Sequence, residues 1–134
     1  MSFDILVFDP AAAPREKEAF LSWWEQQAQW SEDHGYDDAS VCTPALRAWF
    51  TEFAHEYPAM NGPHAPREMP EDEASLTDYS IGRHVIYGAF AWSKADAAHE
   101  AVLRLAAKHG LGVFEASSDS AEVWLPSNGK LSKV

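Results

Sequence analysis

Apolar and polar residues alternate with two different periods along this chain, and these periods predict its strands and helices. The apolar run that begins at Phe3 is too short for a helix and ends before Pro10, so it predicts a buried strand. Later, Gly82-Arg83 separates two apolar runs with the spacing of a two-residue hairpin. The predicted strands lie at residues 3–8, 76–81, 84–92, 111–116 and 121–125.

Three other segments have the period of an α-helix. Pro14 is a typical first helical residue, Thr43 precedes Pro44 as an N-cap, and Ser93 is placed to cap the last helix. The predicted helices cover residues 14–32, 43–57 and 93–109, and the first two carry aromatic stripes: Phe20, Trp23, Trp24 and Trp30, then Leu46, Trp49, Phe50, Phe53 and Tyr57. We interpret these stripes as the layer that packs on the sheet.

The element order is therefore β-α-α-β-β-α-β-β over a single domain, residues 1–134. This order predicts an α+β fold in which helices cover a largely antiparallel sheet, as a variant of the ferredoxin-like arrangement. The length of 134 residues and the apolar content of 46% suffice for one sizeable core. Residues 58–75, with four prolines, have no period and predict a long loop.

The distribution of charge narrows the class of partner. The net charge of −11 argues against binding of nucleic acid, which needs lysine and arginine to neutralise phosphates. Residues 18–78 hold 13 acidic and 2 basic side chains, so this part carries the whole net charge. A local field of one sign favours a basic partner, although the same charge also serves solubility.

The cellular location of the protein is predicted from features that the sequence lacks. There is no apolar stretch of about 20 residues to span a membrane, and the first residues have no basic segment of a signal peptide. With Cys42 as its single cysteine, the chain cannot form an intramolecular disulfide. We expect a cytoplasmic protein without contact with a membrane.

Motifs of known chemistry are missing from the sequence. The six histidines lack the spacing of a metal site, and the acidic segment "DHGYDD" lacks the order of a calcium loop. No phosphate-binding glycine loop, dinucleotide motif or nucleophile elbow occurs. We therefore predict no catalytic residue, no metal and no cofactor, and we consider an enzyme the less favoured class.

Two hypotheses for a site follow. In the first, acidic loops at residues 32–38 and 66–73 bind a basic protein, with two aromatic side chains as anchors. The predicted partner-binding residues are Trp30, Glu32, Asp33, Tyr36, Asp37, Asp38, Glu68, Glu71, Asp72 and Glu73. In the second, a small enzyme or small-molecule-binding protein has a pocket between the aromatic helices and the sheet, near Tyr79, His84 and Trp92.

Three stretches, "TPALRAWFTEFAHEYPAMNGP", "LTDYSIGRHVIYGAFAWS" and "LAAKHGLGVFEASS", cover about half of the chain and carry a resemblance. They resemble a group of small uncharacterised bacterial proteins, which is similar in kind to the immunity proteins encoded beside bacterial toxins. The resemblance implies that the protein neutralises a toxin, and the acidic loops fit a basic toxin domain. It assigns no role to any individual residue.

Overall fold

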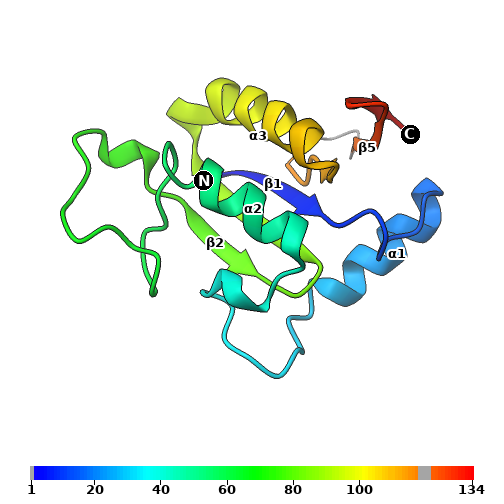
Figure 1. The fold of residues 1–134 in the computed structure, drawn as a ribbon, viewed down its shortest axis with the longest axis horizontal. Coiled ribbons are helices and arrows are strands. Elements are labelled where there is room, and N and C mark those ends of the chain that lie inside the picture. Colours follow the sequence, from blue (N-terminus) through cyan, green and yellow to red (C-terminus); the bar gives the residue numbers. More distant parts are fainter. Residues whose placement is uncertain (1, 118–121) are drawn as a thin grey trace.

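The computed structural model describes residues 2–117 and 122–134. Within them the chain forms three α-helices and one six-stranded sheet whose neighbouring strands are all antiparallel, which confirms the α+β class (Figure 1). The strands are β1 (Ser2–Phe8), β2 (Asp78–Ile81), β3 (Val85–Ala91), β4 (Gly112–Phe114), β5 (Val123–Ser127) and β6 (Lys130–Lys133). Their order in the sheet is β2-β3-β1-β4-β5-β6.

The helices are α1 (Lys17–Gln27), α2 (Pro44–Phe53) and α3 (Ala95–His109), with short 3-10 turns at Ala39–Val41, Glu73–Ser75 and Trp92–Lys94. Each is shorter than its predicted segment. The first helix ends at Gln27 rather than near residue 32 because Trp30 adopts a left-handed backbone conformation with φ of 51°. The third begins at Ala95, after the 3-10 turn, rather than at Ser93.

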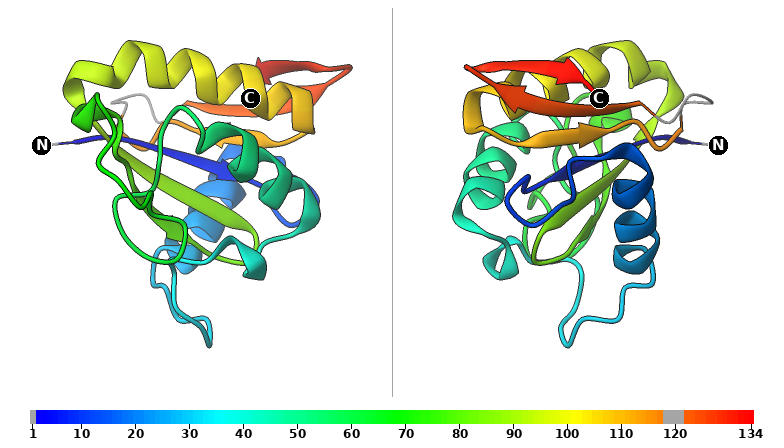
Figure 2. Two further views of the ribbon diagram at one scale, coloured as in Figure 1. Left: turned by 60° about the vertical axis from the view of Figure 1, so that its left-hand side comes forward. Right: turned by 90° about the vertical axis from the view of Figure 1, so that its right-hand side faces the viewer.

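The two aromatic stripes pack on opposite faces of the sheet (Figure 2). Alternate residues of β1 explain this arrangement, because successive side chains of a strand point to opposite faces. Ile5 and Val7 contribute to the core under α2 and α3, while Leu6 and Phe8 contribute to the core under α1. The expectation that the stripes form one layer was therefore wrong.

The end of the chain and the first hairpin differ from the prediction. The predicted connection between the strands at 111–116 and 121–125 lies largely outside the described residues. Strand β6 was not predicted, although Asn128 and Gly129 have φ of 54° and 77° and make the tight turn that joins it to β5. The first hairpin also shifts by one residue, because Gly82 donates to the carbonyl of Val85 and the chain turns at Arg83 and His84.

The core between the sheet and α2 predicts that Trp49 is essential for stability. Its side chain is 1% exposed and stacks on Phe53, with ring centroids 4.5 Å apart. Trp49→Ala is expected to lower the free energy of unfolding by about 3 to 5 kcal/mol. Trp92, which is 49% exposed, is the matched control, and Trp92→Ala should cost about 1 kcal/mol or less. Urea unfolding monitored by circular dichroism measures both, and equal losses would contradict the assignment of Trp49 to the core.

A close contact between β1 and β4 generates a second prediction. A Cβ atom added to Gly112 would lie 2.2 Å from Cζ of Phe8, whose ring is fully buried. Gly112→Ala should therefore destabilise the fold by about 1 to 3 kcal/mol through overpacking. Phe8→Leu makes room at the same place, so the double variant should be less destabilised than the sum of the two single changes. Additive losses in a double-mutant cycle of unfolding free energies would show that this contact is not the cause.

Candidate functional site

The acidic loop at residues 32–38 is hydrogen-bonded to the turn between β2 and β3. The Glu32 carboxylate accepts from the backbone N–H of Arg83 at 2.9 Å, and the carbonyl of Tyr36 accepts from the N–H of Ile81 at 2.9 Å. His34 Nε2 lies 2.5 Å from the same Glu32 carboxylate. This loop is therefore built onto the end of the sheet at several points, and Glu32 serves its structure rather than a partner.

The pKa values of Glu32 and His34 are shifted in the directions expected for a pair of opposite charges. Burial disfavours the ionised form of Glu32, but hydrogen bonds from His34 and Arg83 outweigh it and hold its pKa below the usual range. The pKa of His34 is raised by hydrogen bonds to the carbonyl of Gly35 and to Glu32. Both shifts favour the charged pair that closes this loop.

The two predicted aromatic anchors, Trp30 and Tyr36, contact each other and other parts of the same molecule. Their ring centroids are 5.2 Å apart, and the Trp30 ring also lies edge-on to Trp24 and Tyr87. The hydroxyl of Tyr36 accepts from the backbone N–H of Glu32 at 2.6 Å. Both side chains are half-buried, so they pack the loop against α1 and β3 rather than project toward a partner.

The loop that follows α2 contacts the 32–38 segment through His64, two residues before the second predicted acidic segment. The N–H of Ala39 donates to Nε2 of His64 at 3.0 Å, and a carboxylate oxygen of Asp38 lies 3.3 Å from the same nitrogen. Close by, Gly62 has φ of 80°, and a Cβ atom there would lie 2.8 Å from that of Asp37. Residues 62 and 64 of the loop that follows α2 therefore lie against residues 37–39.

Two of the predicted acidic residues stabilise turns. Asp38 accepts from the N–H of Ser40 at 2.9 Å, and this bond lowers the pKa of Asp38. Asp72 pairs with Lys94, which lowers its pKa, and accepts from the N–H of Ala74 at 3.2 Å. Besides these two and Glu32, the remaining five are exposed and have no side-chain partner among the described residues: Asp33, Asp37, Glu68, Glu71 and Glu73.

The structure does not bring together the residues of the alternative pocket. Tyr79 is buried, donates its hydroxyl to the carbonyl of Tyr57 at 2.6 Å, and has its pKa raised by burial. His84 lies in the turn before β3, whereas the exposed Trp92 follows its other end. Because seven residues of extended strand separate His84 from Trp92, the three side chains do not line one pocket.

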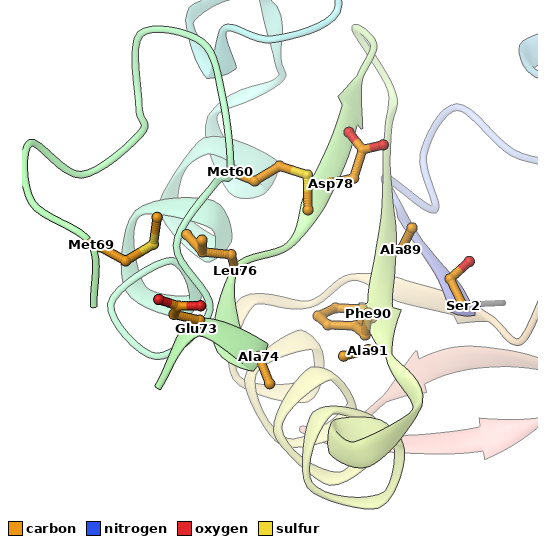
Figure 3. A pocket seen from close by; sticks show the side chains of 10 residues that line it. All are labelled: Ser2, Met60, Met69, Glu73, Ala74, Leu76, Asp78, Ala89, Phe90 and Ala91. Carbon is orange, nitrogen blue, oxygen red and sulfur yellow. The ribbon is translucent and has the colours of Figure 1, made fainter. Parts of the chain in front are cut away.

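The sequence did not reveal a groove of about 530 Å³ between the 58–75 loop and the edge of the sheet (Figure 3). Its loop side carries methionines and its strand side carries small residues, as the figure shows. Two signals point to it in retrospect: the methionines within a proline-rich loop, and the small residues Ala89 and Ala91 at alternate positions of β3. The lining residues are Ser2, Met60, Met69, Glu73, Ala74, Leu76, Asp78, Ala89, Phe90 and Ala91.

The single cysteine lies in the core. Cys42 is 4% exposed, and burial raises the pKa of its thiol to about 12. Across residues 2–117 and 122–134, no three His, Cys, Asp or Glu side chains gather as a metal site would require. In the same ranges, no helix is long and apolar enough to cross a membrane.

Comparisons with known proteins add nothing to this geometry. No family model, no curated protein and no solved structure matches the chain. The resemblance to small bacterial proteins of the immunity kind therefore stays a prediction from the sequence.

The charged pair in the 32–38 loop predicts a pH dependence. The pKa of His34 is raised, so its protonated form stabilises the folded loop. This stabilisation is complete below pH 6.5, the ordinary pKa of histidine, and is lost as the pH rises through the raised pKa. The pKa of Glu32 is lowered, so its ionised form also stabilises the folded loop. This stabilisation is complete above pH 4.5 and is lost as the pH falls through the lowered pKa. The loop should therefore be most stable between pH 4.5 and pH 6.5.

An NMR titration of the His34 ring measures this coupling. The wild-type pKa should lie above 6.5, and Glu32→Gln should move it back toward 6.5. Glu18→Gln, which removes an exposed carboxylate of α1, is the control and should leave the titration unchanged. An identical titration in wild type and Glu32→Gln would contradict the pairing.

Proposed function

We propose that this protein is an acidic binding protein that neutralises a basic protein partner. One observation carries the proposal: the 32–38 and 66–73 segments hold eight acidic side chains, and His64, two residues before the second segment, lies against Asp38 of the first. Five of these carboxylates are exposed and unpaired among the described residues, and they are free to interact with cations. A surface of one sign raises the association rate with a partner of opposite sign and orients it.

The region from residue 18 to residue 78 holds two basic side chains, Arg47 and Arg67. The guanidinium of Arg47 donates to the backbone carbonyls of Ser40, at 3.2 Å, and Cys42, at 2.9 Å. It thereby holds the base of the 32–38 loop. Arg67 is the other basic side chain between residues 18 and 78, against 13 acidic ones.

The specific form that we propose is immunity against a toxin domain. The resemblance of three stretches to small bacterial proteins of this kind supports it, and the acidic surface fits a basic toxin such as a nuclease. The proposal treats the protein as a stoichiometric inhibitor rather than an enzyme, located in the cytoplasm. The buried thiol of Cys42 and the scattered positions of Tyr79, His84 and Trp92 favour binding over catalysis.

We also infer a ferredoxin-like core for this fold. The neighbouring order β2-β3-β1-β4, with α2 before β2 and α3 before β4, supports this inference. Strands β5 and β6 then extend the sheet at one edge, and α1 is an addition on the opposite face.

Charge reversal at two of these exposed carboxylates tests the proposed function. The partner to test is the product of the neighbouring open reading frame. Asp37→Lys with Glu71→Lys should lower its association rate with this protein about tenfold at low salt, since both carboxylates are exposed and without a side-chain partner among the described residues. Stopped-flow fluorescence measures the rate, and added salt should reduce the wild-type rate toward that of the variant.

The matched control is Glu18→Lys with Glu25→Lys, which makes the same change of net charge on exposed positions of α1. This pair should alter the rate much less. Equal slowing by both pairs would mean that only the overall charge matters. A wild-type protein that neither binds the neighbouring product nor protects cells that express it would contradict the immunity role.

A further inference from the structure

We propose that the groove beside β2 binds a segment of the partner in which basic and apolar side chains alternate. This inference rests on the proposed function, because it names the part of a basic partner that this protein would recognise. It is carried by the shape, the lining and the charge of the groove, to which the 66–73 loop contributes Met69 and Glu73.

The lining provides an apolar surface that is open to the outside. Met60 and Met69 are 48% and 65% exposed. Burial of these large apolar side chains against a partner would be favourable, because it removes apolar surface from water. Methionine is flexible and adapts to differently shaped partners. Across the groove, Ala89 and Ala91 leave a low floor, because neither has a side chain beyond Cβ (Figure 3). A volume of about 530 Å³ accommodates several side chains of a peptide.

The charge of the groove selects for a cation. Asp78 and Glu73 line it, both are exposed, and neither carboxylate has a hydrogen-bond or ion-pair partner among the described residues. None of the lining residues is basic. A lysine or arginine side chain fits this combination, because its methylene stem packs on methionine while its charged end reaches a carboxylate.

The edge of the sheet determines how such a segment would bind. Strand β2 is an edge strand, and edge strands commonly accept a further strand. Here the chain itself occupies that position: Thr77 donates to the carbonyl of Pro58 at 2.9 Å, Met60 donates to that of Thr77 at 3.0 Å, and Ile81 donates to that of Tyr36. The partner segment would therefore insert side chains into the groove rather than pair its backbone with β2.

NMR of the methionine methyl groups tests this proposal on the whole chain. The probe is a nine-residue peptide of alternating lysine and leucine, and a peptide of alternating glutamate and leucine is its control. The lysine peptide should shift the methyl signals of Met60 and Met69 in a saturable way, whereas the glutamate peptide should not. Asp78→Asn with Glu73→Gln should weaken binding about tenfold, as loss of two charge-assisted contacts would.

Glu18→Gln with Glu25→Gln removes the same charge on α1 and should leave the affinity unchanged. Methyl shifts that are absent, that are equal with the glutamate peptide, or that weaken equally in both variants would overturn the proposal. Shifts that appear when the protein alone is concentrated would also overturn it, because they would indicate a second copy as the occupant. Saturation by n-butylammonium at the same concentrations would overturn it as well, because it would indicate a small-molecule pocket. The rate test of the proposed function uses Asp37 and Glu71, which do not line the groove, so either proposal can fail without the other.

Discussion

Burial of β1 on both of its faces is the constraint on which the rest of this structure depends. Leu6, Val7 and Phe8 are all fully buried, and alternate residues serve two separate cores. A strand that is apolar on both faces needs cover on both sides, since exposed apolar surface is unfavourable in water. Helices α2 and α3 cover one face, and α1 covers the other. Helix α1 therefore forms a second layer, on the face of the sheet opposite α2 and α3.

Incomplete cover by α1 explains why the groove exists. The Trp24 ring of α1 stacks on Tyr87 with centroids 5.6 Å apart, but Ala89 and Ala91 lie further along β3 and line the groove instead. These alanines share the face of Tyr87 because side chains alternate along a strand. Because alanine side chains are small, the part of the sheet that α1 leaves uncovered exposes little apolar surface. The same strand thus carries a packed half and an accessible half.

Sequence periodicity predicted the α+β class and located most elements, because it reports which positions are buried. It did not predict the face on which each stripe packs, since a helical stripe has the same period on either side of a sheet. Strand β6 was missed although Asn128-Gly129 is a strong hairpin signal, because its residues alternate weakly and are largely exposed. His64 contacts Asp38 and Ala39 across 26 and 25 positions of the sequence, and no local pattern encodes such a contact.

The acidic residues show why composition alone could not identify the site. Asp38 and Asp72 belong to the same acidic segments as Asp37 and Glu71, yet they accept bonds from the first turns of 3-10 helices. Carboxylates used in this way are already hydrogen-bonded, so a partner would have to compete with the backbone for them. Only those without such a bond can exchange water for a cation at little cost. The division between structural and available carboxylates therefore depends on where the backbone turns, and it leaves fewer carboxylates available to a partner than the charge of this region suggests.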